Sequence, residues 1–132
     1  NSGIQWNNGS LITTGATATG VGRGSANTDA IISVQGATET SYAAGLARAY
    51  NGGGYTDWYL PSKNELNQMF LNKATINTIA AANGGSSFST TINYWSSTEN
   101  GWNNAWYQYF ADGGQSDRRK HNTYGVRAVR AF

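Results

Sequence analysis

The start of one helix is marked more plainly in this sequence than any other structural element. Ser62 and Glu65 form an S-x-x-E capping box, in which each side chain accepts a hydrogen bond from the other residue's backbone N–H. Pro61 directly precedes the box and favours an extended conformation for Leu60, so the chain should enter the helix from an extended segment. Downstream apolar residues then share one helical face: Leu66, Met69 and Phe70.

Other helix signals are sparse, and turn signals are frequent. Residues 40–50 are rich in alanine and end at a run of glycines, which predicts a helix, and residues 74–82 favour a short helical turn. Short runs between Asn- and Gly-rich turns predict strands at 4–6, 30–34, 94–97, 105–110, 115–119 and 124–132. The prediction is an α+β domain, with two helices packed on a small, twisted, mostly antiparallel sheet and much irregular loop. With 132 residues, the chain suits one domain, 1–132, around a single core.

Charged residues make up only 12% of the chain, about half the share typical of soluble domains. Solubility must therefore come from Asn, Ser, Thr and Gly, which combine here with five Trp and eight Tyr. Such a mixture is typical of secreted recognition proteins, because aromatic rings give rigid contact area and small polar groups give adaptable hydrogen bonds. A low-charge cytosolic protein is the alternative, and the absence of cysteine does not separate the two. The chain has no long apolar run, so we expect no membrane span, and its start at Asn1 suggests a mature fragment or an excised domain.

Positive charge is concentrated at the carboxyl end. Residues 118–132 hold five bases and no acid, whereas residues 1–117 hold the remaining four bases and all seven acids. This asymmetry favours a polyanionic partner. An ordinary solvated strand end would give the same pattern, and charge alone does not decide between them.

Three motifs in order carry a family resemblance: residues 57–66 (DWYLPSKNEL), residues 94–99 (YWSSTE) and residues 126–130 (VRAVR). Between the last two motifs, Ala105-Trp106-Tyr107, Phe110 and Asp112-Gly113 fit the same pattern. The chain resembles the bacterial family typified by the C-terminal domain of the Legionella collagen-like adhesin. The resemblance covers roughly residues 40–132, and the first 36 residues carry no motif that we can place.

The resemblance implies a C-type-lectin-like fold and a secreted or bacterial cell-surface adhesin. It also implies that the ligand is a sulfated glycosaminoglycan, heparin-like or chondroitin-sulfate-like. A collagen-like stalk before such a domain would bring three chains together, so the family implies a homotrimer, although no Gly-X-Y repeat occurs here.

The chain departs from the family pattern at two positions. Tyr59 stands where the family usually has Arg, which removes a possible structural cation, and Ala128 stands where Cys is frequent, which removes thiol chemistry. The chain also lacks the Glu-Pro-Asn or Gln-Pro-Asp loop of calcium-type lectins, and it has no Asp-x-Asp-x-Asp loop. We therefore expect neither a cofactor nor a high-affinity calcium site.

The main binding candidates are the basic residues near the carboxyl end. Sulfate is a fully ionised anion that suits forked guanidinium donors and ammonium charges. On a strand, Arg118 and Lys120 would point to one side and Arg119 to the other, whereas in a loop all could reach one polyanion. His121 is a minor contributor, because neighbouring cations disfavour its charged form. The candidate ligand-binding residues are Arg118, Arg119, Lys120, His121 and Arg127.

Arg127 and Arg130 would lie on opposite faces of a strand, and at least one could be half-buried against an acid, for which we suggest Glu99. The aromatic run 102–110 admits sugar stacking or core packing. Alternation favours the core for Trp106, Gln108 and Phe110, with Tyr107 and Tyr109 on the exposed face. Trp58, Leu60 and Trp95 are also assigned to the core.

Three functions remain open. The first is an adhesin head that binds sulfated polysaccharide, with steep salt dependence. The second is a neutral-sugar or protein-binding module that uses exposed aromatics and tolerates salt. The third is an enzyme, which the dispersed carboxylates and the single histidine without a Gly-x-Ser-x-Gly elbow disfavour. We expect no catalysis, and the secreted-type composition disfavours nucleic acid as the partner.

Overall fold

The computed structural model describes residues 3–36 and 40–131. Its described residues contain four α-helices, a short 3₁₀ helix η1 (Gly52–Gly54) and two small antiparallel sheets, which confirms the α+β prediction. The helices are α1 (Gly24–Gln35), α2 (Ala43–Ala49), α3 (Lys63–Leu71) and α4 (Lys73–Ala82). The strands are β1 (Ile4–Gln5), β2 (Asn93–Asn100), β3 (Asn104–Tyr109), β4 (Gln115–Arg119) and β5 (Thr123–Tyr124).

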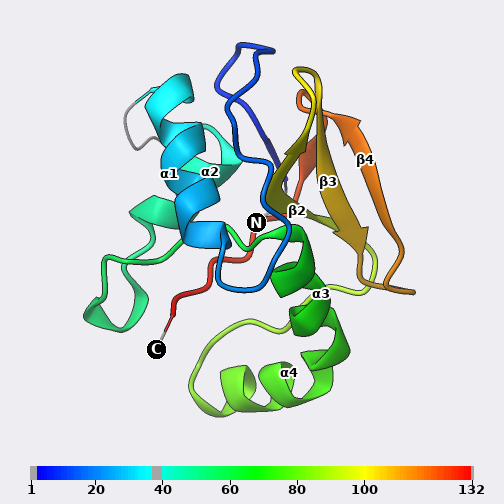
Figure 1. The fold of residues 1–132 in the computed structure, drawn as a ribbon. Coiled ribbons are helices and arrows are strands. Elements are labelled where there is room, and N and C mark those ends of the chain that lie inside the picture. The colour runs from blue at the N-terminus through cyan, green and yellow to red at the C-terminus, as the bar shows by residue number, and fades with distance from the viewer. Residues whose placement is uncertain (1–2, 37–39, 132) are drawn as a thin grey trace.

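The larger sheet has the order β2-β3-β4, so β4 forms one of its edges, and β1 pairs separately with β5. Figure 1 shows α1 and α2 on one side of the molecule, the three-stranded sheet on the other, and α3 with α4 below. The N-terminal segment after β1 runs between α1 and β2 (Figure 1). A backbone hydrogen bond joins this segment to β2: the N–H of Glu99 donates to the carbonyl of Ala16 at 2.8 Å.

The capping box at residue 62 forms as predicted. Ser62 accepts from the backbone N–H of Glu65, and the Glu65 carboxylate accepts from the N–H of Ser62 at 2.9 Å. Glu65 does more than cap α3, because it also accepts from the N–H groups of Gly22 and Gly24 and from the Tyr59 hydroxyl. The start of α1 is therefore fixed by a residue at the start of α3.

Two hydrophobic clusters form the interior. The larger one lies between α1, α2 and the sheet and includes Trp6, Ile31, Leu60 and Trp95, all fully buried. The smaller one packs α3 and α4 against the far end of the sheet and consists of Leu66, Phe88, Tyr94 and Phe110, with Met69 and Phe70 partly buried beside it. The predicted apolar face of α3 is thus confirmed.

Several predicted elements were wrong in type or extent. The strand predicted at 30–34 is the second half of α1, where Ile31 is buried. The Ser-, Asn- and Thr-rich α1 has no side-chain cap of its own, so tertiary contacts rather than local propensity impose the helix. The strand predicted over 124–132 is reduced to β5 and single bridges at Gly125 and Val129, and residue 132 lies outside the described residues. The two expected helices form as α2 and α3, and the helical turn expected at 74–82 is the full helix α4, so α1 is the one helix of the described residues that was not expected.

Candidate functional site

Arg118 and Arg119 lie at the end of β4, on the open edge of the three-stranded sheet. Both side chains are exposed. In the register with β3, Arg118 is opposite Ala105 and Arg119 is opposite Asn104, so the two guanidinium groups leave opposite faces of the strand. Because β4 is an edge strand, a ligand that lies along the edge can reach both of them.

His121 follows in the turn after β4 and is also exposed. Arg118, Arg119 and His121 are called the basic edge below. Within residues 3–36 and 40–131, ion pairs are formed by Arg48, Lys120 and Arg130 and by none of the basic-edge side chains. Arg118 and Arg119 therefore have no ion-pair partner among the described residues, and the carboxylate of Asp117, the residue before them in β4, accepts instead from the side-chain amides of Asn100 and Asn104.

Aromatic hydroxyls accompany Arg118 on its face of the sheet. The rings of Tyr107 and Tyr124 lie 4.9 Å apart, and Tyr124 also contacts Trp95 at 4.5 Å. Burial and the neighbouring Tyr107 raise the pKa of Tyr124, while Arg118 opposes this by favouring the phenolate. Tyr107 is only half-buried, which partly confirms its predicted exposure, and Tyr109 is exposed.

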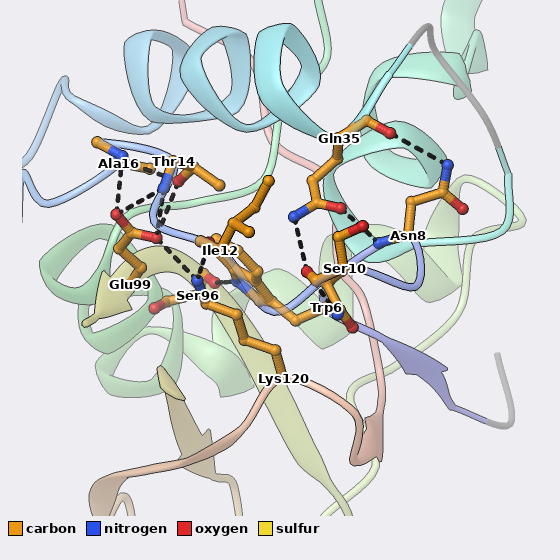
Figure 2. A network of polar contacts seen from close by, with 12 residues as sticks. Trp6, Asn8, Ser10, Ile12, Thr14, Ala16, Gln35, Ser96, Glu99 and Lys120 are labelled. Carbon is orange, nitrogen blue, oxygen red and sulfur yellow. Dashed lines mark hydrogen bonds and ion pairs between the residues drawn. The ribbon is translucent and has the colours of Figure 1, made fainter. Parts of the chain in front are cut away.

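Lys120 does not share this exposure, and the prediction that it faces the solvent is wrong. Its side chain is fully buried and points inward from the turn after β4. The ammonium group donates to the Glu99 carboxylate at 2.8 Å and to the carbonyl of Ile12 at 3.0 Å, and it lies 4.6 Å from the centre of the Trp6 ring (Figure 2). Lys120 thus ties the N-terminal segment to the sheet and has no surface with which to meet a polymer.

Glu99 is the centre of this buried network. Its carboxylate accepts from the backbone N–H and the hydroxyl of Thr14, each at 3.0 Å, and from the N–H of Gly15 at 2.7 Å (Figure 2). Burial alone would raise the pKa of Glu99, but the bonds from Lys120 and from these amides outweigh it and hold the pKa below its usual value. Burial lowers the pKa of Lys120, although Glu99 opposes the shift. The pair is a structural clamp, because each charge is stable inside only while the other is present.

The suggested partner of the C-terminal arginines was therefore wrong. Glu99 binds Lys120, and Arg130 instead forms an ion pair with Asp57 at 2.7 Å. That bond lowers the pKa of Asp57 and raises the pKa of Arg130. Arg127 is half-buried, and its guanidinium carbon lies 4.3 Å from the centre of the Phe88 ring. Arg127 lines a groove that includes no residue of the basic edge among its described lining. The structure thus separates Arg127 from Arg118 and Arg119.

The aromatic residues divide largely as alternation predicts. Gln108 and Phe110 are fully buried. Trp106 is only half-buried, and the ammonium group of Lys63 lies over its ring, 3.7 Å from the ring centre. Trp95 and Leu60 lie in the core as predicted, whereas Trp58 is half-buried beside Tyr50.

Lys63 is a candidate that the sequence did not reveal. It begins α3, yet its ammonium group lies over Trp106, on the face of the sheet from which Arg119 leaves β4. No local pattern could have found it, because the two residues are far apart in the sequence and meet only through the packing of α3 on β3. Lys63 extends the positive charge of this face beyond the basic edge.

Nothing in the described residues has the form of a metal centre, since no three His, Cys, Asp or Glu side chains come together there. The helices of the described ranges include none with the length and apolar character that a bilayer crossing requires.

Comparison with known proteins agrees with the motifs noted above. No curated protein matches the chain. A family model described as the Lcl C-terminal domain matches residues 1–130. This match begins at residue 1, so the N-terminal residues in which the sequence showed no recognisable motif are part of the family's domain as well. The chain belongs to the Lcl C-terminal domain family.

Proposed function

We propose that this domain is the head of a bacterial surface adhesin and binds sulfated polysaccharide, heparin-like or chondroitin-sulfate-like, through its basic edge. The observation that carries the proposal is the pair of adjacent, exposed arginines on an edge strand, with no ion-pair partner among the described residues. Guanidinium groups suit sulfate because their forked N–H donors match its oxygens, and they stay charged at any physiological pH.

The proposed site differs from the cluster predicted from the sequence. Arg118, Arg119 and His121 remain, and Lys63 joins them from α3. Lys120 is excluded because its side chain is fully buried, and Arg127 belongs to a different surface. A polymer lying along β4 would contact Arg118 on one face and Arg119 with Lys63 on the other.

Display and assembly belong to the same proposal. A few exposed cations per domain give modest affinity, so an adhesin of this kind gains most from several heads that engage one polymer together. We therefore assign the domain to a secreted or surface-attached homotrimer that acts by binding rather than by catalysis. Family membership and the low-charge, aromatic-rich composition support this assignment.

The test is the affinity for a heparin oligosaccharide of defined length, measured by calorimetry at several salt concentrations. The double variant Arg118→Gln/Arg119→Gln should bind at least tenfold more weakly. Its plot of log affinity against log salt should also become shallower by about one unit per lost contact, by analogy with counterion release from nucleic acids. Desulfated heparin and single-stranded DNA serve as comparison ligands and should bind far more weakly than heparin.

The matched control is Arg23→Gln/Lys73→Gln, which removes the same charge from other parts of the molecule and should change affinity less than twofold. Lys120→Met, compared at equal folded fraction, should also keep its affinity because the ammonium group is buried. If both double variants lose heparin affinity equally, the loss reflects the net charge of the domain and not the basic edge, which would contradict the proposal. Binding that ignores salt would contradict the proposal and favour recognition through exposed aromatics.

A further inference from the structure

Four Asn-Gly dipeptides occur in the chain, at residues 8–9, 51–52, 83–84 and 100–101. An asparagine followed by glycine readily loses its side-chain amide without an enzyme, because glycine has no side chain that shields its backbone nitrogen or restricts its rotation. All four asparagines are exposed. Neither the dipeptide nor exposure therefore distinguishes the four positions, but their hydrogen bonds do.

Three of these asparagine side chains are held in place. Their amide groups donate to the carbonyl of Gln35 at 3.2 Å from Asn8, to the carbonyl of Ile79 at 2.8 Å from Asn83, and to the carboxylate of Asp117 at 3.2 Å from Asn100. The amide oxygen of Asn8 also accepts from the Ser41 hydroxyl at 3.0 Å. The backbone N–H of Gly84 donates to the carbonyl of Ala81 at 3.4 Å. Each of these three dipeptides must break at least one hydrogen bond before it can react.

Asn51 differs because neither of its reacting groups is held. Within residues 3–36 and 40–131, its side chain forms no hydrogen bond, and the backbone N–H of Gly52 donates to no acceptor. The carbonyls of these two residues do accept, from the N–H of Gly54 at 3.0 Å and from the indole of Trp58 at 3.1 Å. No residue of η1 is buried, and its glycines let the backbone rotate at little cost. Figure 1 shows this segment, in blue-green between α2 and α3, as a loop that projects from the body of the molecule.

We propose that Asn51 is a site of spontaneous deamidation in the folded domain. The backbone nitrogen of Gly52, after losing its proton to the solvent, attacks Cγ of Asn51. The new C–N bond closes an imide ring, and the bond from Cγ to Nδ2 breaks to release ammonia, which takes up a proton. Water then opens the imide at either of its carbonyl carbons, and the product is aspartate or isoaspartate. No oxidant or reductant takes part.

The reaction would change the charge of a groove of about 1150 Å³ that Asn51 lines. Arg127 and Arg130 are the charged residues among the described lining of this groove, and no acid is among them. Deamidation adds a carboxylate to that lining. In the isoaspartate form the main chain also runs through the former side chain, which alters the path from α2 into η1. The groove is separate from the basic edge, so the reaction does not depend on polysaccharide binding.

The experiment incubates the folded domain at mildly alkaline pH, where the backbone nitrogen loses its proton more readily. Peptide mapping with fragmentation in the mass spectrometer then assigns the mass gain to single asparagines, and chromatography separates the aspartate and isoaspartate forms. Asn51 should react at least tenfold faster than each of the other three asparagines. In the chain unfolded with guanidinium chloride, the four rates should lie within about threefold of one another, because no tertiary hydrogen bond then protects any of them.

Asn51→Gln is the matched control, because it keeps an uncharged amide but makes ring closure by Gly52 much slower. This variant should lose the fast reaction and keep the rates at the other three positions. Equal rates in the folded wild type, or a faster reaction at Asn8, Asn83 or Asn100, would overturn the proposal. An Asn51 rate more than tenfold below its rate in the unfolded chain would also overturn it, since the loop would then protect the amide. The readout is a mass, so its outcome is independent of the heparin measurements.

Discussion

At the scale of single residues, Lys120 is the predicted binding residue that the structure places in the interior instead of on the surface. A run of three consecutive bases suggests one solvated cluster, but charge does not say which way each side chain points. β4 ends at Arg119, and the backbone N–H of Lys120 donates to the carbonyl of Asn103 at 2.8 Å, which places its side chain against the interior. The partner that makes burial possible, Glu99, is 21 residues away. Such a pairing cannot be predicted from local pattern, because it depends on how the N-terminal segment crosses β2.

The Glu99–Lys120 pair predicts a specific pH dependence. The pKa of Glu99 is lowered in the folded state, so the carboxylate contributes stability above its unfolded pKa of about 4.3, and this contribution is lost as pH falls through the folded pKa. The free energy of unfolding, measured with urea between pH 7 and pH 3, should therefore fall steeply below about pH 4.3.

Glu99→Gln should lower the free energy of unfolding at pH 7 by about 3–5 kcal/mol, because Lys120 is left buried without its counter-charge. Below pH 5 its decline should be shallower than that of the wild type. Asp57→Asn is the control, since it breaks an ion pair in which the carboxylate is exposed. Parallel curves for Glu99→Gln and the wild type would mean that other carboxylates govern acid unfolding.

At the scale of elements, the sequence predicted what is encoded locally and failed where distant contacts decide. The capping box predicted the first residue of α3, and the turn expected between residues 110 and 115 does separate β3 from β4. α1 was missed because its residues have weak helix propensity and no cap of their own. The start of α1 is held instead by Glu65, which the sequence assigned only to the cap of α3.

This double role predicts that Glu65→Ala is more damaging than Ser62→Ala. Loss of the serine cap should cost about 1–2 kcal/mol. Loss of the carboxylate leaves several donors of two elements unsatisfied, at about 1–3 kcal/mol for each that stays buried. Amide exchange at Gly24 should accelerate in Glu65→Ala but not in Ser62→Ala.

A spectroscopic check accompanies this prediction. Burial, followed by the charge and hydrogen bond of Glu65, raises the pKa of Tyr59 to about 12. Ultraviolet titration of Glu65→Ala should show this phenol ionising at lower pH than in the wild type, toward its usual range. Unchanged Tyr59 ionisation together with unchanged exchange at Gly24 would confine Glu65 to capping α3.

At the scale of the whole molecule, the N-terminal third is part of the core. The recognisable motifs begin near residue 57, but Trp6 is fully buried and its indole N–H donates to the carbonyl of Ser96 at 2.8 Å. The indole N–H of Trp95 donates in turn to the carbonyl of Ile4 at 2.9 Å. The charge pattern suggested the binding candidates, but the sequence could not show the groove, because its lining comes from segments that only the complete fold brings together.

These contacts predict that a fragment of residues 40–132, which holds every recognised motif, does not fold alone. Burying one tryptophan removes on the order of 200 Å² from water and contributes about 5 kcal/mol, and the stability of a whole domain is about 5–15 kcal/mol. The fragment would also lose the backbone N–H groups of Thr14 and Gly15, which stabilise the Glu99 carboxylate. The ion pair between Glu99 and Lys120 would then be exposed to solvent.

We expect this fragment to lack a near-ultraviolet dichroism spectrum and a cooperative unfolding transition, while the complete chain shows both. Adding a peptide of residues 1–36 should restore part of the signal, because β1 then regains its pairing with β5 and Trp6 its place in the core. A fragment that unfolds cooperatively without the peptide would show that the motif-bearing part suffices, and the N-terminal segment would then be an addition to a fold that already exists.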